Sequence, residues 1–144
     1  MQQQDAVSRL VESGFPLGTI ETGAPWRIEA LFRRHERATG EAIYIWERRR
    51  GLYRIGTEYI RIPHTETLGR TLAFVASTIH YGVYVIVGMG EALREEAVVE
   101  RLRRFARSQD RVRRMMVFVD RRIPEVRELS GLTMRLRHDV RKAS

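Results

Sequence analysis

The sequence contains no cysteine, and its only lysine is Lys142. Without cysteine the chain cannot form a disulfide, a thiolate metal site or a cysteine nucleophile, and this absence fits a reducing, cytoplasmic compartment. Without an internal lysine it cannot form a Schiff base, use lysine as a general base or hold a nucleotide phosphate with an ammonium group. Composition alone therefore excludes several classes of enzyme.

The positive charge of the chain comes from arginine. Lysine and arginine number 26 together, against 18 aspartates and glutamates, which gives a net charge of +8 over 144 residues. This charge permits binding to nucleic acid or to acidic surfaces, but a solvated surface held by ion pairs has the same composition. The length corresponds to a single domain, 1–144, that can bury its own core.

Charged residues are missing from residues 71–90. A run of about 20 uncharged residues can span a bilayer. Three features argue against a membrane helix here: the Tyr81-Gly82 break, His80 in the middle of the run, and the β-branched residues that follow. No secretory signal precedes the run either. We therefore expect no association with a membrane.

The same run predicts a helix followed by a central strand. Residues 72–79 have the spacing of a buried helix face, and residues 83–87 form a continuous apolar stretch, typical of a strand covered on both faces. Tyr81 and Gly82 form the turn between them, and His80 is expected to pack beside the strand. The remaining elements are expected to bury this unit.

Strand and helix patterns alternate along the rest of the chain. Strands are predicted at 15–20, 42–46, 83–87, 115–119 and 132–136, and helices at 6–12, 25–38, 72–79 and 91–107. Asp5 and Pro25 suit the starts of the first two helices, and Gly40 suits the end of the second. Thr65 or Thr67 caps the helix that leads into the apolar run.

Three further segments complete the organisation of the chain. Residues 1–14 contain the N-terminal helix, and residues 138–144 form a basic tail that is expected to fray. Residues 53–62 alternate loosely, which predicts either a hairpin or an irregular excursion at a sheet edge. The alternation of elements predicts an α/β fold, a three-layer sandwich around a mostly parallel five-stranded sheet with right-handed crossovers.

The order of elements resembles the N-terminal domain of Ycf-type AAA ATPases. The features that carry this likeness are an acidic, threonine-containing turn after the first strand, a tryptophan in the second and a glycine-leucine pair after it: Glu21, Thr22, Trp46, Gly51 and Leu52. The similarity extends over residues 18–136. It implies a degenerate nucleotide-binding-like domain with the P-loop strand order 5-1-4-3-2, numbered along the five predicted strands.

In that family a separate AAA module hydrolyses ATP, so the resemblance implies a free-standing relative of a non-catalytic domain. It carries over no catalytic residue and implies no cofactor. The residues themselves also argue against a nucleotide-hydrolysing site, because a P-loop needs a lysine after two spaced glycines. The first strand is followed instead by a turn with no lysine, in which Pro25 removes a backbone amide. We therefore expect no enzymatic activity.

The tips of the predicted strands are the candidate ligand site, since α/β folds bind ligands outside the carboxyl ends of their strands. Gly88 and Gly90 can admit an anion at the start of the following helix, or they form only a tight turn. Glu21 and Asp120 can form a carboxylate pair, with Thr22 beside them, or they can bond to turn backbone. The four histidines have no metal-ligand spacing, so no metal is predicted.

A second candidate site combines aromatic and basic residues. Its members are Tyr44, Trp46, Arg48, Arg49, Arg50 and Tyr53. Aromatic rings beside arginines can form a stacking surface for single-stranded nucleic acid. Alternatively, residues 42–46 lie at or near a sheet edge and pair with a second copy of the chain, unless residues 53–62 fold back and cover them.

These observations lead to two hypotheses about function. The first is a cytoplasmic, non-catalytic protein-interaction or regulatory domain whose partner is another protein or a second copy of itself. The alternative is a nucleic-acid-binding module that uses its arginine-rich surface. The distribution of the arginines over the surface separates the two.

Overall fold

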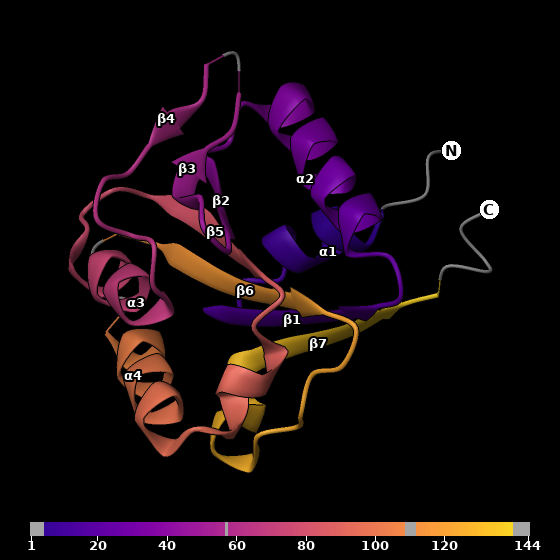
Figure 1. The fold of residues 1–144 in the computed structure, drawn as a ribbon. Helices are drawn as coiled ribbons and strands as arrows, with labels where there is room; N and C mark the ends of the chain where they lie inside the picture. Colours follow the sequence, from indigo (N-terminus) through magenta and orange to yellow (C-terminus); the bar gives the residue numbers. More distant parts are fainter. Residues whose placement is uncertain (1–4, 57, 109–111, 140–144) are drawn as a thin grey trace.

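One seven-stranded sheet organises the part of the chain that the computed structural model describes, residues 5–56, 58–108 and 112–139. Its strands are β1 (Leu17–Thr22), β2 (Ile43–Glu47), β3 (Gly51–Arg54), β4 (Ile60–Arg61), β5 (Gly82–Val87), β6 (Arg114–Asp120) and β7 (Thr133–His138). They lie in the order β4-β3-β2-β5-β6-β1-β7 (Figure 1). The β3 and β4 strands are antiparallel to their neighbours, and the other pairs are parallel.

Helices cover both faces of this sheet. They are α1 (Ala6–Glu12), α2 (Pro25–Thr39), α3 (Leu68–Ser77) and α4 (Glu96–Arg107), with the 3-10 helices η1 (Gly90–Arg94) and η2 (Arg127–Leu132). In Figure 1 the first two helices lie on one side of the sheet, and α3 and α4 lie on the other. The three-layer α/β architecture predicted from the sequence is confirmed.

The predicted central strand is β5, which is buried on both faces. Val83 and Val85 pack under α1 and α2, whereas Tyr84 and Ile86 pack under α3 and α4. Period-two alternation within a wholly apolar strand supplies side chains to both cores. The same alternation in β2 places Tyr44 and Trp46 on the α3 and α4 face and Ile43 and Ile45 on the opposite face.

The sheet has seven strands rather than the five predicted, and its complete order therefore differs from the predicted order. Within it the five expected strands follow one another as β7-β1-β6-β5-β2. The two additional strands, β3 and β4, extend the sheet beyond β2. The glycine-leucine pair after the second strand belongs to β3, and Gly51 begins this strand with a left-handed φ of 77°.

The strand β2, expected at or near a sheet edge, lies third from that edge and pairs on both sides, with β3 and β5. Residues 53–62 fold back as the covering hairpin, which was one of the two alternatives. Thr65 fastens this excursion: its hydroxyl accepts a hydrogen bond from the Leu52 amide at 2.8 Å, and its carbonyl accepts one from Trp46 Nε1 at 2.7 Å. A dimer formed through the backbone edge of β2 is therefore excluded.

Several helix ends follow the sequence signals. Asp5 accepts a hydrogen bond from the Ser8 amide, Pro25 opens α2, and Gly40 ends it with φ 72°. Thr67, rather than Thr65, caps α3 through the Arg70 amide. None of the helices among the described residues is long and apolar enough to cross a membrane.

Other expectations around the apolar run need correction. Ile79 lies beyond the end of α3 and is 77% exposed, and His80 is exposed rather than packed beside β5. The helix predicted over 91–107 is two elements, since Glu95 is extended between η1 and α4. The basic tail predicted at 138–144 begins in the last residue of β7, and residues 140–144 lie outside the described residues.

Arg114, the first residue of β6, joins the sheet to α3 and α4. Its Nη1 donates to the carbonyls of Val75 and Ala76 at 2.9 and 2.8 Å, and its Nη2 lies 3.4 Å from the Ser108 carbonyl just after α4. The guanidinium also lies over the Phe105 ring. One buried side chain thus binds the C-terminal ends of both helices.

We predict that Arg114→Met destabilises the fold by about 2–4 kcal/mol, because it keeps most of the apolar stem but leaves the carbonyls at the ends of α3 and α4 without their donor. This loss corresponds to a fall in Tm of roughly 5–12 °C in thermal unfolding followed by circular dichroism. The control is Arg104→Met on the exposed side of α4. A loss for Arg114→Met no larger than that of the control would contradict the prediction.

Candidate functional site

The parallel arrangement brings the predicted strand-tip residues together. Glu21 and Asp120 occupy paired positions at the ends of β1 and β6. Both carboxylates bind backbone amides: Glu21 accepts from Ile123 at 3.0 Å, and Asp120 accepts from Gly90 at 2.8 Å and from Arg121 at 2.7 Å. They hold turns in place instead of facing a common ligand space.

The charge state of Glu21 follows from the same bonds. The hydrogen bond from the Ile123 amide lowers the pKa of Glu21, and Arg137, 3.0 Å from its other oxygen, lowers it further against the effect of burial. Glu21 is therefore held as a carboxylate. Its two oxygens are already bonded to the chain's own donors.

The other strand-tip residues form tight turns. The Thr22 hydroxyl accepts from the Ala24 amide at 3.0 Å and lies 2.9 Å from His138 Nδ1. Gly88 has a left-handed φ of 82°, and its amide donates to the Val119 carbonyl. The amide of Gly90 donates to Asp120, so it does not offer an anion its hydrogen bond. A shallow hollow of about 320 Å³ remains beside these turns, bounded by Glu21, Thr22, Gly23, Arg121, Arg137, His138 and Asp139.

The aromatic members of the second candidate site are buried. Tyr44 stacks on Tyr84 with ring centroids 4.7 Å apart, and Trp46 donates to the Thr65 carbonyl inside the core. The Tyr53 hydroxyl donates to Glu47 at 2.7 Å. These rings cannot form the stacking surface predicted from the sequence, because the folded chain covers them.

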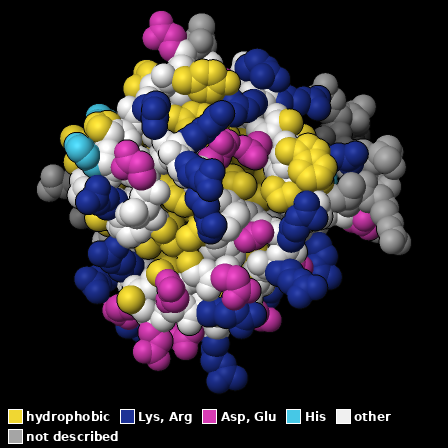
Figure 2. Space-filling model, in the orientation of Figure 1, with side chains coloured by type: hydrophobic (Ala, Val, Ile, Leu, Met, Phe, Trp, Pro, Cys, Tyr) yellow, Lys and Arg dark blue, Asp and Glu magenta, His cyan; other side chains and the backbone are white. Residues whose placement is uncertain are grey.

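Arg48, Arg49 and Arg50 do lie at the surface, on the turn between β2 and β3. Arg50 approaches Glu47 at 3.7 Å, and Arg48 Nη2 lies 3.6 Å from the sulfur of Met89. Figure 2 shows blue arginine side chains interspersed with magenta carboxylates and yellow hydrophobic patches. On the face drawn there, the arginines do not join into one basic surface.

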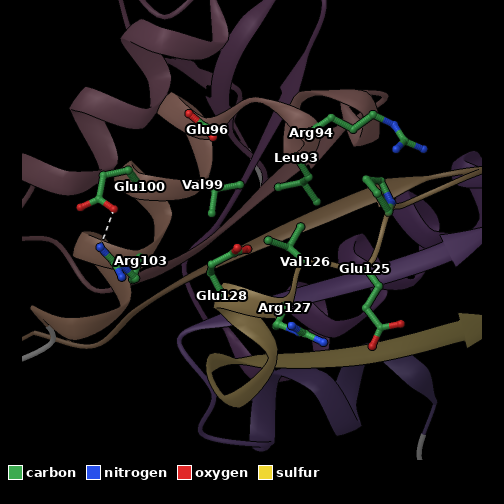
Figure 3. A pocket seen from close by; sticks show the side chains of 11 residues that line it. Leu93, Arg94, Glu96, Val99, Glu100, Arg103, Glu125, Val126, Arg127 and Glu128 are labelled. Atoms are coloured by element: carbon green, nitrogen blue, oxygen red, sulfur yellow. Dashed lines mark hydrogen bonds and ion pairs between the residues drawn. The ribbon is translucent and has the colours of Figure 1, made fainter.

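A larger hollow, of about 830 Å³, lies between α4 with η1 and the segment that leads into η2 (Figure 3). We call it the α4 groove. It is lined by Leu93, Arg94, Glu96, Val99, Glu100, Arg103, Pro124, Glu125, Val126, Arg127 and Glu128. Sequence reasoning missed it, because its two walls come from segments some 25–30 residues apart whose packing no local pattern encodes.

The groove has apolar and charged lining residues. Leu93, Val99 and Val126 pack against the core cluster on this side of the sheet. Around them, Arg103 binds Glu100 at 2.7 Å, the pair marked by a dashed line in Figure 3. Within the described part of the chain, Glu96 and Glu128 form no ion pair. Apolar contact area edged by charges of both signs suits binding to a protein surface.

A cluster of titratable groups lies where α2 meets the end of β2. Burial, together with a hydrogen bond to Glu47 and repulsion by its charge, raises the pKa of Glu29 to about 7. Burial opposes ionisation of Glu47, but hydrogen bonds from Glu29 and Tyr53 and the nearby arginines lower its pKa. Burial and the bond to Glu47 raise the pKa of Tyr53 to about 12. Below about pH 7, Glu29 therefore keeps its proton and shares it with Glu47 in a hydrogen bond.

No local sequence pattern indicates this pair, because Glu29 and Glu47 are distant along the chain and have the pattern of ordinary surface residues of a helix and a strand end. Metal binding has no support in the described residues, where no group of three or more histidine, aspartate or glutamate side chains could hold an ion. The chemistry available at these places is hydrogen bonding and ion pairing.

Comparison with known proteins identifies one similarity. A family model described as "SpoVK-like AAA ATPase, N-terminal domain" matches residues 3–138, nearly the whole chain. Searches of curated proteins and of solved structures found no significant match.

We predict that Gly90→Ala destabilises the strand-tip turn by about 1–3 kcal/mol. A Cβ atom at this position would lie 2.3 Å from the Arg122 carbonyl oxygen and 3.0 Å from Asp120 Oδ2, so the backbone must shift. Gly131→Ala is the control, since its Cβ would meet nothing within 4 Å. Urea unfolding of both variants tests this, and equal midpoints would contradict it.

We predict that Glu29→Gln changes how stability depends on pH. Folding raises the pKa of Glu29 from 4.5 to about 7. Between pH 4.5 and pH 7 the folded state therefore binds more protons than the unfolded state, and the free energy of unfolding falls as the pH rises through this range. Glutamine cannot ionise and keeps a donor for Glu47. The variant should therefore match the wild type near pH 4 and exceed it at pH 8 by about 1 kcal/mol, a value reduced for solvent screening.

Urea unfolding at several pH values measures this difference. Glu96→Gln on α4 controls for the general effect of removing one negative charge from the chain. A constant offset between Glu29→Gln and the wild type across the pH range would show that the two glutamates do not share a proton.

Proposed function

Because this chain belongs to the family of SpoVK-like AAA ATPase N-terminal domains, we propose that it is a non-catalytic, cytoplasmic domain that binds a protein partner. The observation that carries this proposal is the contrast between two surfaces. The strand tips, where α/β folds bind small ligands, are occupied by the chain's own hydrogen bonds, whereas the α4 groove is open.

We also propose that the domain is a degenerate relative of nucleotide-binding domains, as in the Ycf-type AAA ATPases. The relative order of the five expected strands supports this proposal. In a P-loop, successive backbone amides and a lysine hold the phosphates. Here Pro25 has no amide hydrogen, the Ala24 amide donates to Thr22, and no lysine follows. A phosphate would find neither its donors nor its positive charge at this turn.

The α4 groove supports the choice of a protein as the partner. Its volume exceeds that of the strand-tip hollow more than twofold, and its apolar side chains lie beside carboxylates and guanidinium groups. Apolar side chains of a partner can gain affinity by packing on Leu93, Val99 and Val126, and the charged residues around them can orient the partner. The groove lining contains no serine, threonine, cysteine, lysine or histidine, so it offers no nucleophile–base pair.

Nucleic-acid binding, the alternative from composition, has less support. The aromatic rings that would stack on bases lie in the core, and carboxylates separate the arginines on the face seen in Figure 2. Contacts of arginines to phosphates alone would give weak binding that weakens steeply with salt.

We predict that the purified domain neither hydrolyses nor binds ATP with Mg²⁺, measured by phosphate release and by isothermal titration calorimetry. A single-stranded oligonucleotide should bind only at low salt. Turnover that disappears in Asp120→Asn would contradict the non-catalytic proposal. Oligonucleotide binding that persists at physiological salt would favour the nucleic-acid alternative.

We predict that peptides selected from a random phage-displayed library against the domain bind the α4 groove. Val99→Arg should weaken the binding of these peptides about tenfold or more, because the larger side chain fills the groove and places a charge against its apolar residues. Ala73→Arg, on the exposed side of α3, is the matched control. Fluorescence anisotropy with labelled peptides gives the affinities. Selected peptides that bind Val99→Arg as tightly as the wild type would place protein binding elsewhere.

A further inference from the structure

The two edges of the sheet differ in length and in side-chain pattern. At one end β4 has only two residues, Ile60 and Arg61. At the other end β7 has six, and among the described residues it pairs only with β1. Every second residue of such an edge strand directs its N–H and C=O groups away from the sheet, where another strand can bond to them.

Side chains alternate along β7 between two different environments. Arg135 and Arg137 lie on the face of α4 and η2, where they approach Glu125 and Glu21, each at 3.0 Å. Both arginines remain largely accessible, with 48% and 82% of the side chain exposed. Met134 and Leu136 lie on the opposite face and pack against the core under α1 and α2.

This pattern disfavours pairing between two copies of the chain. In a symmetric antiparallel pair centred on Arg135 or on Leu136, Arg135 would lie opposite Arg135 or Arg137 of the second copy. Directly opposed like charges on neighbouring strands are destabilising. The charges on β7 therefore disfavour its pairing with β7 of a second copy, as charges on edge strands of natural sheets commonly do.

An extended segment with acidic residues would instead place opposite charges against the arginines of β7. Carboxylates at every second position would lie opposite Arg135 and Arg137, and the intervening residues would continue the apolar face of Met134 and Leu136. We propose that β7 is a docking edge for an extended acidic segment of a partner protein, in which acidic and apolar residues alternate. This edge borders the α4 groove at Glu125, the ion-pair partner of Arg135, but its backbone hydrogen bonds do not depend on that groove.

The length of β7 sets the length of the segment. Six residues at about 3.3 Å each give an edge of roughly 20 Å, enough for a strand of about six residues. Main-chain hydrogen bonds supply affinity in this mode of recognition, and alternate side chains supply specificity.

Synthetic peptides titrated into the ¹⁵N-labelled domain test the proposal. The probe is a peptide of about six to eight residues in which Glu and Val alternate, matched to the length of β7. The expected result is a set of amide shifts confined to β7 and its neighbour β1. Replacing Glu by Arg, or methylating the backbone nitrogens that face β7, should weaken binding at least tenfold, because either change removes the charge match or the hydrogen-bond donors.

Variants of the domain separate the edge from general attraction to a basic protein. Arg135→Gln and Arg137→Gln should each weaken the Glu-Val peptide about threefold, as expected for exposed ion pairs. Arg121→Gln, an exposed arginine outside β7, should leave the affinity unchanged. Absence of shifts at millimolar peptide, shifts located in the α4 groove, or equal affinity of the N-methylated peptide would each overturn the proposal. None of these results bears on nucleotide binding, and failure at β7 without shifts in the α4 groove leaves the Val99→Arg test unchanged.

Discussion

The buried guanidinium of Arg114 joins the sheet to both helices on one of its faces. It stands at the start of β6, beneath the ends of both helices on one face of the sheet, where unpaired carbonyls form the negative ends of the helix dipoles. A planar group with five donors can serve several carbonyls at once, which the ammonium group of lysine cannot do in the same geometry. The side chain also stacks on Phe105 and so completes the core.

Two consequences follow from this anchor. It fixes α3 and α4 side by side with their C-terminal ends together, and Arg101, which donates to the Gly69 carbonyl at 2.9 Å, joins them again further along. The position of α4 in turn sets one wall of the α4 groove. The surface proposed to bind a partner thus depends on a residue buried beneath it.

The sequence predicted those parts of the fold that local patterns encode. Apolar alternation located five strands, and the residue types at helix ends located Asp5, Pro25 and Gly40, because capping depends on neighbours within a few positions. The strands β3 and β4 were predicted only as one of two alternatives for residues 53–62, since they are short. Their pairing depends on Thr65, whose contacts with Leu52 and Trp46 span more than ten residues. The burial of Tyr44 and Trp46 in β2 also depends on such distant contacts, so the sequence alone could not distinguish these core residues from an exposed stacking surface.

For the candidate sites too, contacts set by the regular geometry of the sheet could be predicted, and contacts set by loops and packing could not. The approach of Glu21 to Asp120 could be predicted, because parallel strands align their ends. Their bonds to the amides of Ile123 and Gly90 could not, since these depend on how two loops return to the sheet. The proton shared by Glu29 and Glu47 likewise arises from packing of a helix on a strand end, with burial supplying the change in pKa.

Arginine has at least three different roles in this chain, and a net charge of +8 distinguishes none of them. Arg114 is buried and structural, and Arg101 braces two helices. Arg135 and Arg137 face solvent on an edge strand, where they oppose self-pairing and favour an acidic strand. A charge supports recognition only where backbone or apolar groups beside it are also free to bind. The strand β7 meets that condition, because one of its edges pairs with no other strand in the described part of the chain. The location of the arginines, and not their number, therefore favours a protein over a nucleic acid as the partner.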